Sequence, residues 1–362
     1  MSSAGQALNQ SRDCIITTRD KNATLVIGDS GGYQIASGRL HINGDQDRHR
    51  ILRWLEANAD VAMTLDVPTG PVGKPGYRYS TPKECLTATL EHLEFFKAHR
   101  NTASDTVFLN VLQGNKTPDS DHWYEAVKHY PFEGWAFAGP LRHNFYNLCR
   151  RILIMADDNL IQNRAWIHIL GTSEFATATC LTALQRSINR HLNPNLRISY
   201  DTSTPFRMIS WRLVYALPKL DAKSMTMTSA PSPDDRAFLG STLRWPWPSP
   251  LGDRMVLGDI CVAKPDAYVS TWQDQQTQAY LTHHNLAALC SGVALANRIF
   301  DQESVLHDHT VARSVGAVVE AIERVIASGS LATLEGLRST FSKLREETPT
   351  ESDEAEHRVF EV

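Results

Sequence analysis

The sequence contains no Cys-x-x-Cys pair, and its six cysteines are scattered between residues 14 and 290. This distribution argues against a disulfide framework and against a standard zinc site. Long apolar runs are missing as well, since none approaches the ~20 residues of a membrane-spanning helix. The N-terminal stretch MSSAGQALNQSRD is polar and does not have the form of a secretory signal. These absences predict a cytoplasmic protein with no membrane partner.

The chain also lacks an excess of basic residues, because 36 Lys and Arg stand against 40 Asp and Glu. Much of the imbalance lies in residues 345–362, which hold seven acids and two arginines. The chain before this segment is therefore close to neutral, and its charge neither supports nor excludes a polyanionic partner. Residues 346–362 are predicted to form a disordered acidic tail.

Short apolar runs rich in β-branched residues alternate with segments of helical spacing. In chain order the apolar runs are residues 24–28, 61–65, 107–112, 135–139, 166–170 and 197–200. Continuous apolar strands that alternate with helices indicate a parallel sheet covered on both faces. A closed (β/α)8 barrel and an open doubly wound sheet both fit this pattern.

Distinctive residues at the strand ends favour the barrel. One follows or ends each apolar run: Asp29, Asp66, Gln113, Gly139, Gly171 and Asp201. In a barrel the carboxyl ends of the strands converge on one mouth, where active sites are built from several strands. In an open sheet the same residues would spread along an edge. We therefore predict an α/β fold of the (β/α)8 TIM-barrel type.

The regular pattern is interrupted after the sixth run. Residues 205–264 include the stretch RWPWPSP and predict an irregular insertion at the barrel mouth. Helical spacing resumes over about 275–345. We therefore predict one barrel domain over residues 1–345, followed by the tail.

Three aspartates at one barrel mouth suggest a particular chemistry. A lone buried acid is more often a helix cap or a member of an ion pair than a functional group. Several acids together fit double displacement at an acetal-like carbon, in which one acid attacks and another moves protons. From these residues alone we expect a barrel enzyme that uses carboxylates on a glycosidic bond.

The stretch GDSGGYQI at residues 28–35 resembles the signature S-D-S-G-G-[FY]-Q of the tRNA-guanine transglycosylases. The resemblance covers residues 24 to 207 and continues in the same order through five more segments. These are ADVAMTLDVPT, NVLQG, WAFAGPL, IHILGTS and YDTSTPFR. The first and last matches are the specific ones, and a barrel fold is what the family implies.

The resemblance implies a role for each matching residue. Asp201 matches the nucleophile that attacks C1′ of the target nucleotide and forms a sugar–enzyme ester. Asp29 matches the general base that takes the proton from the incoming base. Asp66 matches the carboxylate that reads N1–H and the exocyclic amine of guanine. Gln113 and the backbone at Gly139 match the donors to the carbonyl oxygen of the base.

Further positions of the substrate site follow from the same resemblance. Tyr33 and Leu170 match the two faces that sandwich the heterocycle, with Leu170 in place of the usual methionine. Ser30, Gly31 and Gly32 belong to the turn that lets the base and its ribose lie against bare backbone. Arg207 matches an arginine near the nucleophile and is expected to contact a phosphate of the nucleic acid.

The chain departs from the tRNA enzymes at their zinc site, which has the form C-x-C-x-x-C…H. Only Cys261 and His284 remain as weak candidates for metal ligands, and one thiol with one histidine does not make a closed tetrahedral site. Cys290 or His283 would have to complete it. We therefore predict no cofactor, and we interpret His284 as a buried helix histidine.

A retained base pocket with reduced tRNA-reading equipment resembles the 7-deazaguanine DNA-modification transglycosylases of phages and bacteria. That resemblance implies exchange of guanine in DNA for a free 7-deazaguanine base, such as 7-cyano-7-deazaguanine, which protects the DNA from restriction. The target base would have to leave the stack. A transglycosylase that acts on tRNA and a non-catalytic subunit of such an enzyme are the alternatives, and related enzymes suggest a homodimer.

Overall fold

The computed structural model describes residues 2–8, 16–114, 116–139, 144–233, 238–261, 272–302 and 307–346. The chain divides into two compact units. Unit 1 comprises Met1–Thr172 and Gln185–Asp201, and unit 2 comprises Ser173–Leu184 and Thr202–Val362. The acidic tail lies, beyond its first residue, outside the described residues. The single domain over residues 1–345 stays a prediction.

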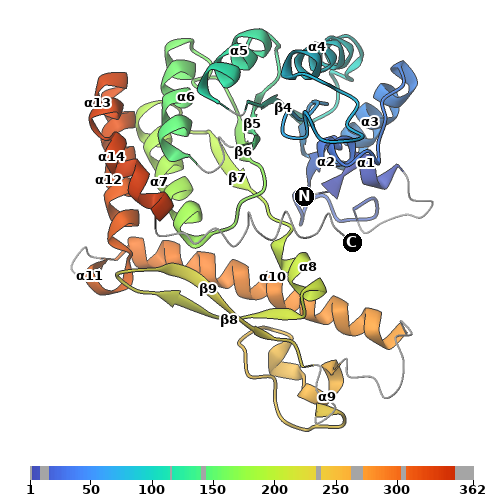
Figure 1. Cartoon of the computed structure of the whole chain (residues 1–362), viewed down its shortest axis with the longest axis vertical. Coiled ribbons are helices and arrows are strands. Elements are labelled where there is room, and N and C mark those ends of the chain that lie inside the picture. The colour runs from blue at the N-terminus through green and yellow to red at the C-terminus, as the bar shows by residue number, and fades with distance from the viewer. Residues whose placement is uncertain are drawn as a thin grey trace. The chain divides into compact units, whose positions relative to one another are not determined.

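Unit 1 is built on a seven-stranded parallel sheet that is curled (Figure 1). The strands are β1 (Ser2–Ser3), β2 (Ile27–Asp29), β3 (Val61–Met63), β4 (Val107–Leu112), β5 (Gly134–Phe137), β6 (Trp166–Ile169) and β7 (Arg197–Tyr200). Their order in the sheet is their order in the chain, and every neighbouring pair is parallel. The fold is therefore mixed α/β with successive crossover connections, as the alternating pattern predicted.

The curled sheet differs from the predicted barrel in its closure. Among the described residues there is no eighth strand joining β7 back to β1. The next strand after β7 is β8 (Leu213–Leu220), which pairs with β9 (Met225–Pro231) in a separate antiparallel sheet. The described sheet thus corresponds to an incomplete (β/α)n arrangement.

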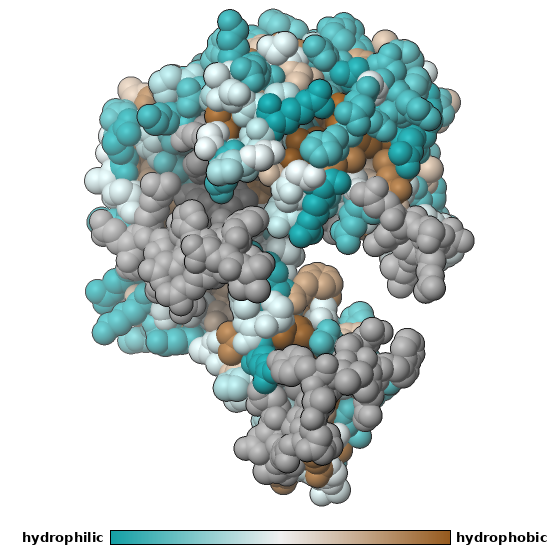
Figure 2. All heavy atoms as spheres, turned by 45° about the vertical axis from the view of Figure 1, so that its right-hand side comes forward, coloured by the Kyte–Doolittle hydropathy of each residue, from teal (hydrophilic) through white to brown (hydrophobic). Residues whose placement is uncertain are grey.

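Helices connect the strands of unit 1 and cover its sheet (Figure 1). They are α1 (Ala4–Ala7), α2 (Gly32–Ala36), α3 (Asp45–Asn58), α4 (Pro82–His99), α5 (Thr117–Val127), α6 (Phe145–Asp157) and α7 (Phe175–His191), of which only the part from Gln185 onward belongs to unit 1. Helix α4 begins where Thr81 accepts a hydrogen bond from the backbone N–H of Glu84, with Pro82 in the first helical position. Figure 2 shows mostly hydrophilic side chains on the visible upper surface of the molecule, with some hydrophobic ones between them.

The inner face of the curled sheet carries an apolar core. Side chains alternate between the two faces of a strand, so residues two apart share a face. The buried residues of this inner core are Val61, Met63, Leu109, Val111, Ala136 and Ala138, and Ile27, Val107, Trp166 and Leu170 pack against them. The alternation continues to the strand ends, where Asp29 follows Ile27 by two and Gln113 follows Val111 by two. The two-residue alternation along each strand therefore places these polar side chains on the inner face, at the carboxyl ends of the strands.

Unit 2 contains the β8–β9 hairpin and a set of helices. The helices are α8 (Thr204–Ser210), a 3-10 turn (Gly252–Arg254), α9 (Leu257–Ile260), α10 (Trp272–Phe300), α11 (His307–Thr310), α12 (Arg313–Ser328), α13 (Leu331–Gly336) and α14 (Arg338–Glu346). One hydrophobic cluster of unit 2 is formed by the buried residues Val214, Trp245, Met255, Ile260 and Leu281. In the described residues, no helix combines the length and the apolar character that crossing a membrane requires.

The hairpin corrects the prediction of an irregular segment over 205–264. Asp221 closes its turn by accepting hydrogen bonds from the backbone N–H groups of Lys223 and Ser224. Pro218 sits where the register shifts, at an irregularity that tolerates a residue without an N–H. Pro218 is therefore accommodated within a strand at a special position. Trp245 of the RWPWPSP stretch is only 6% exposed and serves as core.

One glycine of the sheet generates a stability prediction. A Cβ on Gly134 would collide with the carbonyl oxygen of Trp166 and lie 2.5 Å from Leu109 Cδ2. Gly134→Ala should therefore lower the free energy of unfolding by about 1–3 kcal/mol, the usual cost of overpacking. Urea-induced unfolding measures this change.

Gly70→Ala is the matched control, because a Cβ at Gly70 meets no atom within 4 Å. Its free energy of unfolding should stay unchanged or rise by less than about 1 kcal/mol. Equal stability of the two variants would contradict the close approach of β4, β5 and β6 at Gly134.

Candidate active site

The three aspartates singled out in the sequence gather at one edge of the unit 1 sheet. Asp29 ends β2, Asp201 directly follows β7, and Asp66 follows β3 by three residues. In a parallel sheet these are the carboxyl ends of the strands, which share one edge. The charge of Asp201 raises the pKa of Asp29, and the charge of Asp29 raises the pKa of Asp66. The carboxyl group of Asp29 therefore lies within electrostatic range of the other two.

Asp66 and Gln113 form a buried pair. Each is 5% exposed, and Gln113 Nε2 donates a hydrogen bond of 2.7 Å to Asp66 Oδ2. Burial raises the pKa of Asp66 to about 7, the charge of Asp29 adds to this effect, and the hydrogen bond from Gln113 opposes it. Near neutral pH the carboxyl group is thus divided between its protonated and ionised forms. Gly139 lies beside the pair, since a Cβ there would be 3.7 Å from Gln113 Oε1.

The turn after β2 places two glycines, which have no side chains, next to the carboxyl groups. Gly31 has φ 112°, and a Cβ there would lie 2.9 Å from Leu40 Cδ2, so this position requires glycine. Gly32 faces Asp66 instead, because its Cβ would be 3.4 Å from Asp66 Oδ1. Ser30 is fully buried, and its hydroxyl donates to the carbonyl oxygen of Thr64 at 3.1 Å. The Ser30 bond ties the end of β2 to the end of β3.

The two predicted stacking residues differ in their surroundings. Tyr33 on the short helix α2 is 61% exposed, so its ring is open to solvent. Leu170 is partly buried and packs against the inner core of the sheet. Arg207 belongs to unit 2, where its guanidinium lies 5.0 Å from the centre of the Trp211 ring. Pro140 and Leu141 of the WAFAGPL segment lie outside the described residues.

Asp201 is held by two donors on one of its oxygens. Its Oδ1 accepts a hydrogen bond of 2.9 Å from the backbone N–H of Gly171 and lies 3.2 Å from His168 Nε2. Burial by itself would raise the pKa of Asp201, but the bonds from His168 and Gly171 outweigh it and hold the pKa below its ordinary value. Asp201 is therefore ionised at neutral pH.

Asp29 has the opposite electrostatic character. Burial raises its pKa, and the charge of Asp201 raises it further, although hydrogen bonds from the Ser3 side chain and the Gly31 N–H oppose both. Two neighbouring carboxyl groups whose pKa values are displaced in opposite directions fit a division into a nucleophile and a proton carrier. This arrangement can perform covalent catalysis with a separate acid–base group.

The sequence analysis missed the residues that hold Asp201. His168 on β6 is fully buried, and Ser199 on β7 contacts it at 2.8 Å between Oγ and Nδ1. A signal was present, because His168 precedes Leu170 by two and Ser199 precedes Asp201 by two, which places them on the same strand faces. A polar residue inside an otherwise apolar strand such as WIHIL needs a partner.

The weak candidates for zinc ligands do not form a site together. His284 on α10 is fully buried, and its Nε2 donates to the carbonyl oxygen of Tyr215 at 2.8 Å. Its Nδ1 accepts from Trp245 Nε1 at 3.3 Å, so both ring nitrogens already have protein partners. Within the described ranges no three His, Cys, Asp or Glu side chains gather as metal ligands, Cys261 included.

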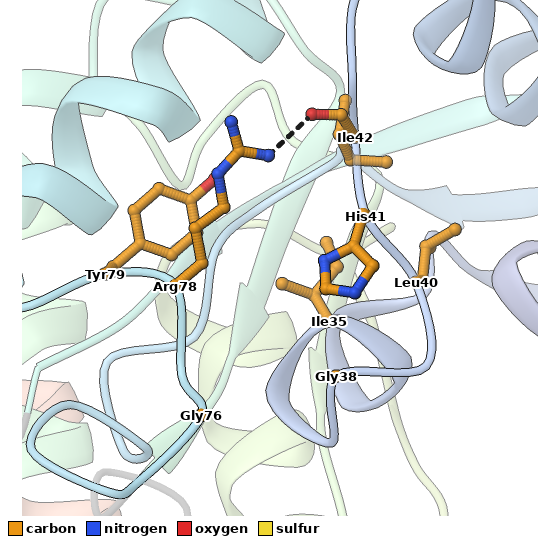
Figure 3. A pocket seen from close by; sticks show the side chains of 8 residues that line it. All are labelled: Ile35, Gly38, Leu40, His41, Ile42, Gly76, Arg78 and Tyr79. Atoms are coloured by element: carbon orange, nitrogen blue, oxygen red, sulfur yellow. Dashed lines mark hydrogen bonds between the residues drawn. The ribbon is translucent and has the colours of Figure 1, made fainter.

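Two recesses of unit 1 are lined by residues other than the three acids. Figure 3 shows the smaller one, where the segment after α2 meets the segment before α4 and Arg78 Nη1 donates to the carbonyl oxygen of Ile42 at 3.0 Å. Its volume of about 10 Å³ is room for one water molecule and not for a purine. The larger, an open groove beside Glu56 and His99, lies near the ends of α3 and α4, before β3 and β4 begin. It therefore belongs to the opposite edge of the sheet.

No protein-family model matches this sequence, and no curated protein matches it.

The Asp66–Gln113 pair generates a prediction that needs no substrate. Titration of the Asp66 side-chain carboxyl, followed by ¹³C NMR, should give a pKa of about 7. In Gln113→Leu the pKa should rise, because the hydrogen bond that favours the ionised form is lost. In Asp29→Asn it should fall, because a neighbouring negative charge is removed. A wild-type pKa near 4 would contradict the buried position of Asp66.

Proposed function

We propose that this protein is a nucleic-acid guanine transglycosylase that exchanges guanine in DNA for a 7-deazaguanine base, such as 7-cyano-7-deazaguanine. The observation that supports the proposal most is the pair formed by Asp29 and Asp201. The two carboxyl groups lie at the ends of strands of one sheet, the charge of Asp201 adds to the burial that raises the pKa of Asp29, and the two pKa values are displaced in opposite directions. The resemblance of residues 24–207 to guanine transglycosylases supplies the substrate class. We propose further that the curled sheet is a variant of the (β/α)8 barrel.

The first displacement uses the ionised carboxylate. One oxygen of Asp201 forms a bond to C1′ of the target nucleotide while the bond from C1′ to N9 of guanine breaks. Asp29, whose raised pKa favours its protonated form, gives a proton to the departing guanine. The products are free guanine and an ester between Asp201 and the sugar.

The second displacement reverses these roles. Asp29, now ionised, takes the proton from the ring nitrogen of the incoming 7-deazaguanine. That nitrogen attacks C1′, and the ester bond breaks to restore the Asp201 carboxylate. The proton balance closes because Asp29 ends each cycle in its starting form, and no co-reactant besides the base is needed.

Asp66 and Gln113 are suited to read the purine edge. An ionised Asp66 offers two acceptor oxygens to N1–H and the exocyclic amine, and the Gln113 amide has a second hydrogen for the carbonyl oxygen of the base. The missing Cβ of Gly32 leaves space beside Asp66 Oδ1 for a flat ring. The open ring of Tyr33 and the side chain of Leu170 can stack on its faces, at about 1–3 kcal/mol per base.

The choice of DNA depends on the departures from the tRNA enzymes. The sequence keeps Cys261 and His284 of the zinc pattern, and both nitrogens of His284 are bonded inside unit 2. A target base in duplex DNA would have to be flipped out to reach Asp201. Exchange on tRNA uses the same chemistry, and the experiment below separates the two substrates.

Incubation with labelled 7-cyano-7-deazaguanine and either duplex DNA or tRNA tests the proposal. We expect label in the DNA, and Asp201→Ala should reduce it to background because no ester forms. Label in tRNA alone would reassign the enzyme to tRNA. Absence of exchange on both polymers would contradict an active transglycosylase and favour a non-catalytic subunit.

Base binding should depend on pH through Asp66. Reading the base requires the ionised form, so affinity for free guanine should be constant above about pH 7 and fall up to about tenfold per pH unit below it. Isothermal calorimetry from pH 5 to pH 8 measures this. Asp66→Asn should bind more weakly by about 1.5–3 kcal/mol at pH 8 and lose the pH dependence. A variant that keeps the wild-type profile would remove Asp66 from base recognition.

A further inference from the structure

Strands β6 and β7 carry a continuous hydrogen-bonded chain on their shared inner face. Trp166 Nε1 donates to Ser199 Oγ at 2.6 Å, Ser199 Oγ lies 2.8 Å from His168 Nδ1, and His168 Nε2 lies 3.2 Å from Asp201 Oδ1. His168 and Ser199 are direct partners in the strand register, which explains their contact. The chain ends at the nucleophile of the proposed reaction.

The two ends of this hydrogen-bonded series fix the direction of its terminal bonds. The indole of Trp166 can only donate, so Ser199 Oγ accepts there and keeps its own hydrogen to donate. The ionised Asp201 can only accept, so the hydrogen must lie on His168 Nε2. With the hydrogen on Nε2, the Nδ1 of His168 can accept a hydrogen bond from the hydroxyl of Ser199. All four groups are then satisfied in one arrangement.

The two oxygens of Asp201 are consequently unequal. Oδ1 accepts from His168 and from the Gly171 N–H, whereas Oδ2 has no hydrogen bond to the part of the chain that the structure describes. An oxygen with two donors has its lone pairs engaged, while the other oxygen keeps its own for attack.

We propose that His168 is a positioning residue that holds Asp201 by Oδ1 and thereby presents Oδ2 to C1′. This role rests on the proposed transglycosylase function. When the bond from Oδ2 to C1′ forms, Oδ1 becomes the carbonyl oxygen of the ester and keeps its two donors. When the ester breaks, the same donors stabilise the negative charge that returns to the carboxylate. His168 moves no proton in either step, since Asp29 carries the proton.

Three substitutions separate positioning from a structural role of the buried histidine. His168→Leu removes both nitrogens, His168→Gln keeps an amide that can donate, and Ser199→Ala leaves the imidazole without its anchor. His92→Leu is the matched control, because His92 on α4 is also buried, at 2% exposed. Urea unfolding shows first which variants are folded.

The first readout is the rate of the covalent DNA–protein adduct in a single turnover, set against the affinity for free guanine. His168→Leu should slow adduct formation by about 10- to 100-fold, the loss of one hydrogen bond to a charged group, with guanine affinity unchanged. His168→Gln should recover part of the rate, Ser199→Ala should slow it to a lesser degree, and His92→Leu should leave it unchanged.

The second readout does not need activity. ¹⁵N NMR of the wild-type protein should show a hydrogen on Nε2 of His168, and the carboxyl pKa of Asp201 should rise in His168→Leu. An Nε2 that carries no hydrogen, or a wild-type adduct rate in a folded His168→Leu, would overturn the positioning role alone. A wild-type protein that forms no adduct with any nucleic acid would overturn the proposed function, and the role of His168 with it.

Discussion

The site depends on one geometric constraint, the alternation of side chains along parallel strands that all end at the same edge. Alternation sends every second residue to the inner face of the curled sheet, which is apolar along the strands. Where the strands end, the same inward positions are polar, as at Asp29, Gln113 and Asp201. Acids that lie far apart in the sequence are thereby brought within range of one another's charge.

Burial then gives these similar groups different properties. All three aspartates lose hydration, which raises a carboxyl pKa, but their hydrogen-bond partners differ. Asp201 receives two donors on one oxygen and remains ionised. Asp66 receives one hydrogen bond from an amide, and its pKa is about 7. For Asp29 the neighbouring charge of Asp201 adds to burial in raising the pKa. Gathering acids in this way opposes folding, and active sites are where such a cost is ordinarily found.

Much of the fold followed from local patterns. Each of the six predicted strands overlaps an observed one, since apolar runs and the helical spacing between them are read from neighbouring residues alone. Two predictions from the sequence were wrong. The closed barrel was expected, whereas the described sheet has seven strands, and residues 205–264 were expected to be irregular, whereas they contain the β8–β9 hairpin. Strand closure and strand pairing depend on partners elsewhere in the chain, which a local pattern does not contain.

By itself the sequence determined the α/β alternation, the polar strand ends and the glycine turn beside Asp29, because each is a property of adjacent residues. Only the tertiary structure decided that Gln113 bonds Asp66, that His168 and Ser199 hold Asp201, and that the carboxyl pKa values diverge. Those properties depend on distances between atoms of different strands and on exclusion of water. Both arise only when the chain has folded.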